Sequence, residues 1–450
     1  MSILIRNAGT VVTCDDHDRV LHHVDVLLEG GAISRIGRVE EGADEVVDGA
    51  ELILYPGLVN THHHLYQYFT RNLPPMQGLE LFDWLTALYG IWARLNENTV
   101  RLSSLCGMGE LLKFGCTTCF DHHYVFPRGA GDLIGAQFEA AERLGIRMHA
   151  SRGSMSLSKK DGGLPPDSVV QTTEEILSDS LRLIEAYHDP RPLSMRQLVL
   201  APCSPFSVTG DVMKESAALA RRYGVRLHTH LCETRDEERF TLSAFGMRPL
   251  AYMESVDFIG NDVFYAHGIH FNDAELRLLA DTQTGVAHCP CSNMKLSSGV
   301  ARIPDMLRLG VPVGLAVDGS ASNDASNLLD EIRVSYLLHR LTYGAEAPTG
   351  YELLKLATRG GAKLLGRDDI GQLAEGKAAD LFAIRADRLE LVCADADVQN
   401  LFGTVGWHMP ADYVFVNGKK VVENGTLLTI DEAAVAREAR AEVSRLLADA

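Results

Sequence analysis

Three consecutive histidines, His62, His63 and His64, follow an apolar run and a Pro-Gly break. In an extended backbone, residues i and i+2 point to the same side, so His62 and His64 can converge on one metal ion while His63 faces elsewhere. Imidazole is a good ligand for zinc or iron, but two histidines need further ligands from other segments. The triplet alone could equally well be a cluster of surface histidines. The choice between a metal site and a surface cluster therefore depends on whether further ligands occur elsewhere in the chain.

Suitable partners recur downstream, each at the end of another apolar run. They are His228, His230, Glu233, His267, His288 and Asp318. Three histidines and an aspartate form a credible site for one metal ion with room for water. We expect His230 to be the third histidine ligand because it lies nearer the strand end than His228. His228 shares its face but lies deeper, and is expected to be a packed residue or one that supports a ligand. Asp318 is expected to complete the set.

Glu233 lies three residues beyond His230, after the strand, where a carboxylate can reach a water molecule on the metal. A metal ion lowers the pKa of such water from about 15.7 to roughly 7. The chemistry then needs a proton carrier that can also donate to a leaving group, and we assign this role to Glu233. Alternatively, Glu233 could be a charge at a helix N-terminus that complements the helix dipole, and both roles could hold at once.

Apolar, strand-like runs alternate with amphipathic, helix-like segments, and the candidate ligands follow the apolar runs. The apolar runs are 53–59, 117–120, 146–150, 197–201, 225–231, 263–266, 285–287 and 313–317, and the helical segments include 102–114, 133–144, 173–187, 212–223, 273–281 and 303–309. This order predicts an α/β fold, a (β/α)8 TIM barrel, whose reactive residues lie at the C-terminal ends of the strands.

Two flanking regions, 1–55 and 368–428, depart from this pattern and alternate in short strands with turns. Asn417-Gly418 is a strong hairpin-turn signal in the second of them. We predict that both termini form one small composite β-sandwich beside a barrel of residues 56–367. Residues 429–450 are expected to form a C-terminal helix.

The composition of the 450-residue chain limits the kinds of partner. A net charge of −18 disfavours phosphate backbones, so we expect no nucleic acid as partner, and any nucleobase that the protein handles is expected to be a free small molecule. Neither a signal-like segment nor an apolar run of transmembrane length is evident, and the nine cysteines are scattered. We therefore expect a cytoplasmic protein without a membrane partner, and we also expect a homo-oligomer.

Together these motifs resemble the amidohydrolase superfamily, and specifically its aminohydrolase (deaminase) branch. The matching stretches are Pro56-Gly-Leu-Val-Asn-Thr-His-His-His, His228-Thr-His-Leu-Cys-Glu-Thr, Ala266-His-Gly-Ile-His, His288-Cys-Pro-Cys-Ser-Asn-Met-Lys-Leu, Val317-Asp-Gly-Ser-Ala-Ser-Asn and Gly376-Lys-Ala-Ala-Asp-Leu. The resemblance implies one divalent metal ion, zinc or alternatively iron, held by His62, His64, His230 and Asp318. It also implies that Glu233 shuttles protons, that His267 orients the attacking water, and that His267 and Asp318 stabilise the attacking oxygen.

Binuclear members of the superfamily carry a bridging modified lysine at the end of the fourth strand. That end reads Leu198-Val-Leu-Ala-Pro-Cys203-Ser204-Pro here and contains no lysine. The resemblance therefore favours one metal ion and release of ammonia from a heterocycle over hydrolysis of an amide or ester.

Within the deaminases, three stretches look like those of 8-oxoguanine deaminases. They are Thr118-Cys-Phe-Asp-His-His-Tyr, Ala201-Pro-Cys-Ser-Pro-Phe-Ser-Val-Thr and Cys289-Pro-Cys-Ser-Asn. This similarity implies hydrolytic deamination of a free 2-amino oxopurine, 8-oxoguanine, to urate and ammonia. By position alone, the candidates for binding the ring are Tyr66, Gln67, His123, Ser204 and His288.

Three alternatives remain open at this point. One is a hydroxyatrazine-type s-triazine aminohydrolase with the same metal site and a different pocket. Another is an S-adenosylhomocysteine- or adenosine-type deaminase, although these usually carry a histidine where Cys203 stands. The third is a non-enzymatic scaffold, against which the intact ligand set and Glu233 argue.

Overall fold

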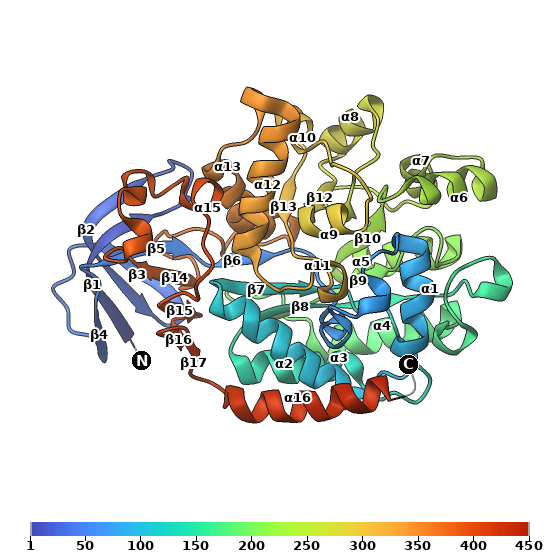
Figure 1. Ribbon diagram of the computed structural model, residues 1–450, viewed down its shortest axis with the longest axis horizontal. Coiled ribbons are helices and arrows are strands. Elements are labelled where there is room, and N and C mark those ends of the chain that lie inside the picture. Colours follow the sequence, from blue (N-terminus) through green and yellow to red (C-terminus); the bar gives the residue numbers. More distant parts are fainter. Residues whose placement is uncertain (1, 449–450) are drawn as a thin grey trace.

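The computed structural model describes residues 2–448 and contains two β-sheets with helices packed around them (Figure 1). Eight parallel strands form one sheet, in chain order from one edge to the other. They are β6 (Leu58–Asn60), β7 (Cys116–Asp121), β8 (Arg147–Ser154), β9 (Arg196–Pro202), β10 (Arg226–Leu231), β11 (Val263–His267), β12 (Gly285–His288) and β13 (Val313–Leu315). The predicted parallel barrel is confirmed.

The barrel closes between its first and last strands just beyond their ladders. The Thr61 backbone N–H and hydroxyl donate to the Leu315 carbonyl, at 3.4 and 3.0 Å. The Asp318 N–H then donates to the His62 carbonyl at 3.1 Å. The seam of the barrel therefore lies where two predicted metal ligands face each other.

Six helices agree with the amphipathic segments of the sequence. They are α2 (Glu97–Lys113), α3 (Leu133–Leu144), α4 (Thr173–Tyr187), α5 (Gly210–Tyr223), α8 (Asp273–Thr282) and α10 (Ile303–Leu309). Gly145, Gly224 and Gly310 end three of them in the left-handed conformation, with φ of 75°, 68° and 81°. Glycine adopts this conformation without the steric cost of a Cβ atom, which explains the sharp ends of these helices.

The remaining helices lie mostly in the connections at the C-terminal ends of the strands and after the barrel. They are α1 (Leu81–Trp92), α6 (Arg235–Phe245), α7 (Pro249–Ser255), α9 (Pro290–Lys295), α11 (Ser320–Asn323), α12 (Leu328–Tyr343), α13 (Gly350–Lys355), α14 (Gly361–Leu364), α15 (Leu401–Thr404) and α16 (Glu432–Leu447). Among residues 2–448, no helix combines the length and apolar character needed to cross a membrane.

Strands from both ends of the chain form the second sheet, in the order β17-β16-β15-β14-β5-β1-β2-β3, with β4 paired to β1. Their bounds are β1 (Ser2–Val12), β2 (Val20–Glu29), β3 (Ala32–Gly37), β4 (Glu45–Asp48), β5 (Leu52–Pro56), β14 (Leu381–Arg385), β15 (Tyr413–Val416), β16 (Lys419–Glu423) and β17 (Thr426–Leu427). The N- and C-terminal strands meet where β5 pairs with β14. The predicted separate layer built by both termini is confirmed.

One expected strand is in fact two. The apolar run 53–59 divides at Gly57 into β5 of the terminal sheet and β6 of the barrel. A Cβ atom at Gly57 would lie 2.1 Å from the Thr117 hydroxyl oxygen, so only glycine fits where the chain passes between the sheets. The continuous apolar character of this run hid the break, because both halves are buried.

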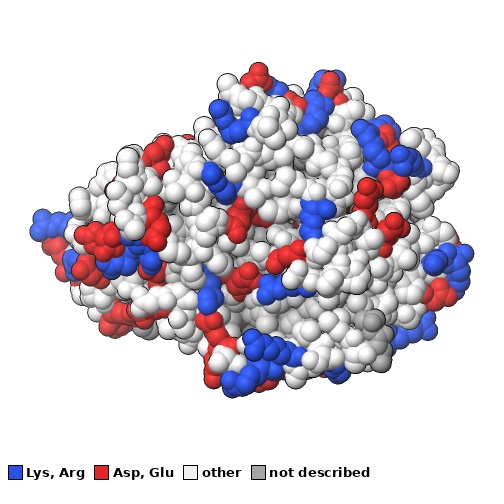
Figure 2. Space-filling model, in the orientation of Figure 1, with Lys and Arg blue, Asp and Glu red and all other residues white. Residues whose placement is uncertain are grey.

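The surface helix α16 packs along α2, as Figure 1 shows at the lower edge of the molecule. Lys113 Nζ lies 2.8 Å from Glu432 Oε2 at one end of this contact, and Asn98 Nδ2 donates to Glu442 Oε2 at 3.1 Å at the other. Over the face shown in Figure 2, acidic and basic side chains are interspersed. The charge of this face is therefore mixed in sign.

The two sheets are joined by a buried ion pair between Arg147 of β8 and Asp380, which precedes β14. The guanidinium donates from Nε to Asp380 Oδ2 at 2.9 Å and from Nη2 to Oδ1 at 3.0 Å, and both side chains are almost fully buried. Asp380 also accepts the Asn417 N–H at 2.7 Å. Such a bidentate pair fixes geometry as well as charge.

Replacing Arg147 with methionine is expected to lower the free energy of unfolding by about 3–5 kcal/mol, because it leaves the Asp380 carboxylate buried without its counter-ion. Urea unfolding followed by circular dichroism measures this. The control is Arg191→Met, which removes an exposed pair with Asp189 and should change stability little. An equal loss of stability in both variants would show that the buried ion pair between the sheets contributes no more to the free energy of unfolding than the pair at the surface.

Candidate active site

Four predicted ligands converge at the C-terminal ends of the barrel strands. His62 and His64 follow β6, His230 lies in β10 and Asp318 follows β13; all four are buried. Asp318 Oδ1 lies 3.3 Å from both His62 Nε2 and His64 Nε2. His64 Nε2 lies 3.2 Å from His230 Nε2. The ligand-type atoms fall into two closely spaced groups that share His62: one also contains His64, His122 and His230, and the other contains Asp318 and His267.

Hydrogen bonds to backbone carbonyls orient two of these rings. His64 Nδ1 lies 2.7 Å from the His122 carbonyl oxygen, and His230 Nδ1 lies 2.6 Å from that of Cys203. A carbonyl oxygen can only accept, so each Nδ1 carries the proton and each Nε2 presents a lone pair. Two such lone pairs at 3.2 Å repel each other unless a cation lies against both, and this favours a bound metal ion.

His62 is oriented by a second histidine. His228 Nδ1 lies 2.9 Å from the Phe264 carbonyl oxygen and is therefore protonated, which leaves His228 Nε2 as an acceptor. That atom lies 2.9 Å from His62 Nδ1, so His62 also carries its proton on Nδ1. His62 Nε2 is buried without a hydrogen-bond partner among the described residues. Its lone pair is free for a metal ion, and His228 supports the ring from the other side.

The electrostatics of the site keep the ligands in metal-binding forms. Burial lowers the pKa of His62, His64 and His230, so their imidazoles are neutral. Burial alone would raise the pKa of Asp318, but the neighbouring imidazoles of His62, His267 and His64 hold it well below its usual value. Neutral imidazoles and an ionised carboxylate are the forms that bind divalent metals.

Glu233 and His267 face each other beside this group, with Oε2 of Glu233 3.5 Å from Nε2 of His267. Burial raises the pKa of Glu233 to about 7, partly offset by His267 and reinforced by Asp318. Burial opposes protonation of His267, yet Glu233 and Asp318 raise its pKa above its ordinary value. A carboxyl group poised near neutrality beside an imidazole suits proton transfer at neutral pH.

His267 is held in place by Asn293 of α9, whose Oδ1 lies 2.9 Å from His267 Nδ1. His267, His62 and Asp318 also form a second group of ligand-type atoms within 4.8 Å of one another. His267 therefore borders the space between the metal ligands and Glu233. Its position fits the predicted role of orienting a water molecule.

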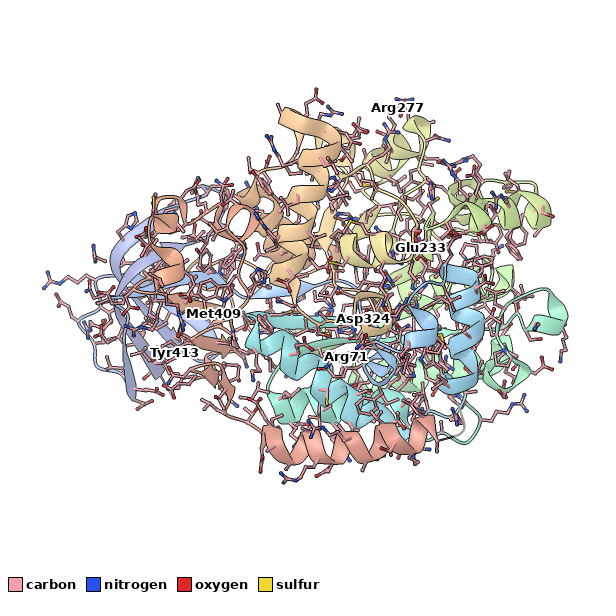
Figure 3. The ribbon with its side chains drawn as sticks, in the orientation of Figure 1. Arg71, Glu233, Arg277, Asp324, Met409 and Tyr413 are labelled. Atoms are coloured by element: carbon pink, nitrogen blue, oxygen red, sulfur yellow. The ribbon has the colours of Figure 1, made fainter. Side chains whose placement is uncertain are left out.

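A cavity of about 390 Å³, including the part open to solvent, lies over these residues. Its walls are formed by Leu81, Trp84 and Leu85 of α1, together with His64, Gln67, Tyr124, Cys203, Phe206, His230, Glu233, His267, Leu296, Asp318 and Ser322. Figure 3 shows Glu233 beside α1, above the end of β10. Most of the wall is apolar, and polar groups are concentrated at the metal ligands.

Of the five residues proposed to bind the ring of the substrate, only Gln67 lines this cavity. Neither atom of its amide has a hydrogen-bond partner among the described residues, although the side chain is buried. The other four are buried away from the cavity wall. Tyr66 packs on Trp92 and His123, His123 donates to the Val125 carbonyl, Ser204 bonds Ser207, and His288 lies 3.3 Å from His339.

Several residues of the site were not identified from the sequence. His122 stacks on His230, with ring centroids 4.7 Å apart, and belongs to the same ligand-type group as His62 and His64. Trp84 and Phe206 supply the aromatic walls. The apolar spacing of residues 81–92 could have revealed α1 as a helix, but not that it would fold over the barrel mouth.

Comparison with known proteins agrees with this geometry. Residues 53–424 match the amidohydrolase family. An 8-oxoguanine deaminase from Pseudomonas aeruginosa is 46% identical over 426 residues, covering 94% of each chain. A hydroxydechloroatrazine ethylaminohydrolase from a Pseudomonas species is 42% identical, covering 97% of this chain and 94% of that protein.

Among solved structures, atrazine chlorohydrolase from Arthrobacter aurescens complexed with zinc superposes with a TM-score of 0.94. It is 34% identical and covers 98% of this chain and 100% of its own. The fold, the converging ligands and these matches, which span nearly the whole sequence, lead to one conclusion. The chain is a member of the amidohydrolase family.

Proposed function

We propose that this protein is a metal-dependent hydrolytic deaminase whose substrate is 8-oxoguanine, which it converts with water to urate and ammonia. The observation that carries the proposal is the Glu233–His267 pair facing the histidine–aspartate group inside a largely apolar cavity. The 46% identity to an 8-oxoguanine deaminase supports the choice of substrate.

His62, His64, His230 and Asp318 would hold one divalent metal ion. We propose zinc, as in the atrazine chlorohydrolase structure, with iron as the alternative. A bound divalent metal supplies a Lewis acid that brings the pKa of water to about 7. The three Nε2 lone pairs and the ionised Asp318 carboxylate fit such an ion without rearrangement of their tautomers.

The residues around the ligands move the protons. Glu233 Oε2 accepts one proton from the attacking water and delivers it to a ring nitrogen, and it then passes the second proton of that water to the amino group, which leaves as ammonia. His267, fixed by Asn293, donates or accepts at Nε2 and keeps the attacking oxygen in line. Overall, one water molecule adds, the exocyclic C–N bond breaks, and oxygen replaces nitrogen on the ring carbon.

The cavity walls would hold the ring by its faces and one edge. Trp84 and Phe206 offer aromatic surface for a flat heterocycle. The unpaired amide of Gln67 offers one donor and one acceptor for ring nitrogen or oxygen. Buried polar groups of this kind discriminate strongly, because a ligand without the matching group leaves them unpaired.

A second candidate is an s-triazine bearing an alkylamino group. Leu81, Leu85 and Leu296 form an apolar part of the wall where an alkyl chain could lie. The hydroxydechloroatrazine ethylaminohydrolase match supports this alternative.

A substrate panel separates the two. We expect 8-oxoguanine to exceed hydroxyatrazine, guanine, adenosine and S-adenosylhomocysteine by at least about tenfold in kcat/KM, since loss of a matched polar contact costs more than a small apolar change. Ammonia release together with loss of the substrate's ultraviolet spectrum measures the reaction. Gln67→Leu should reduce activity on 8-oxoguanine more than on hydroxyatrazine. A higher kcat/KM for hydroxyatrazine would overturn the purine assignment.

A further inference from the structure

The turn that carries Glu233 has an unusual backbone. Cys232, directly after β10, has φ of 56°, in the left-handed region that residues with a Cβ atom rarely occupy. A non-glycine residue in this region costs on the order of 1–3 kcal/mol and persists only where its surroundings hold it. The structure must therefore contain groups that hold this turn.

Glu237, in the first turn of α6, lies under the Cys232 turn and is fully buried. Its Oε1 accepts the Cys232 N–H at 2.9 Å, and its Oε2 accepts the Glu233 N–H at 2.9 Å. One carboxylate thus binds both successive N–H groups of the strained turn. On the other side, the Cys232 carbonyl accepts the N–H groups of Ile269 and His270, at 2.9 and 3.0 Å, in the connection that follows His267.

We infer that Glu237 is a positioning residue for the reaction: its carboxylate holds the Cys232 turn so that the Glu233 side chain is aimed at His267 and the metal ligands. The inference rests on the proposed function, because it assigns Glu237 no role except through Glu233. Glu237 lines no part of the cavity, so it has no direct contact with substrate. Without it, the turn would relax and displace Glu233 from its position 3.5 Å from His267.

The test compares Glu237→Gln, which should lower kcat, with a control substitution that should not. Glu237→Gln keeps the size of the side chain, but its amide NH₂ would face one of the two N–H groups, so one hydrogen bond is lost. We expect kcat for the best substrate of the panel to fall by about 10- to 100-fold, as for a reacting group displaced by roughly 1 Å. KM should change less than about threefold and the metal content should stay at the wild-type value, because the cavity walls and ligands are untouched.

The matched control is Glu175→Gln. Glu175 also accepts a backbone N–H, that of Thr172 at 2.8 Å, but it does so in the capping box of α4 and away from the cavity. We expect wild-type kcat for this variant. If Glu175→Gln and Glu237→Gln lower kcat equally, the effect is general destabilisation and the inference fails.

A double-mutant cycle distinguishes positioning from a structural role. In a Glu233→Gln background, Glu237→Gln should cause no further loss of rate, because there is no proton carrier left to aim. Additive losses would overturn the inference. If Glu233→Gln alone has no effect, the proposed function fails instead, so the two failures are distinguishable. Should Glu237→Gln not fold, Glu237→Asp decides the question by the same cycle, since it retains the carboxyl group but cannot reach both N–H groups.

Discussion

The Glu233→Gln variant is expected to retain its metal ion and to lose kcat by about 10²-fold or more, the usual contribution of a positioned acid–base group. Glutamine has nearly the same shape, so the cavity should stay intact. Glutamate at this position is buried with Oε2 3.5 Å from His267 Nε2 and can exchange a proton there, whereas glutamine cannot. Elemental analysis and steady-state ammonia release on 8-oxoguanine measure the two quantities separately.

The control for this variant is Glu238→Gln, five residues further along the chain. Glu238 bonds Arg235 and Arg248 near the surface and lines no part of the cavity. Its rate should stay close to that of the wild type. Wild-type turnover by Glu233→Gln would remove Glu233 from the mechanism, and loss of metal in that variant would make it a ligand instead of a proton carrier.

Substitution of a metal ligand is expected to abolish both metal binding and turnover. Changing only a hydrogen-bond partner of a ligand typically costs 10–100-fold in metal affinity, and removing a ligand should cost more. In His230→Ala, the Nε2 lone pair that lies 3.2 Å from His64 Nε2 disappears. We expect about one equivalent of metal per wild-type chain and much less than one equivalent in His230→Ala. Removing the metal from the wild-type enzyme with a chelator should leave it inactive.

A buried histidine outside the site serves as the control for metal content. His149 in β8 is fully buried and lies 3.3 Å from Arg367, away from the cavity. His149→Asn should therefore keep the wild-type metal stoichiometry. Two equivalents of metal in the active wild-type enzyme would contradict the assignment of a single site.

The convergence of the four candidate ligands could be predicted from the sequence because it follows from strand geometry. The alternation of side chains along a strand places His62 and His64 on one side, and the parallel order of eight strands brings His230 and Asp318 to the same end of the barrel. The distances from His64 to His230 and from Asp318 to His62 and His64 agree with this. The depth of His228 in its strand indicated a packed residue, but not its contact with His62.

The cavity wall could not be predicted in the same way, because it depends on contacts between segments far apart in the chain. Trp84 reaches the cavity only because α1 folds over the barrel mouth, and no local pattern encodes that docking. His63 is a smaller example: its Nδ1 accepts the His64 N–H at 2.8 Å, and its Nε2 lies 3.0 Å from Ser326. Alternation showed that its side chain points away from the metal ligands, but not that it fixes the backbone of one of them.

The pairing of β5 with β14 has a consequence for synthesis on the ribosome. His62 and His64 follow β5 and β6 directly, whereas β14 is made roughly 320 residues later, or roughly 15–65 s at ordinary elongation rates. Until then, β5 lacks the neighbour to which Ile53 and Leu54 are matched through Ile384 and Ala383. We expect nascent chains to contain the histidine triplet while the neighbouring terminal sheet still lacks β14. Metal acquisition should accordingly follow synthesis of β14.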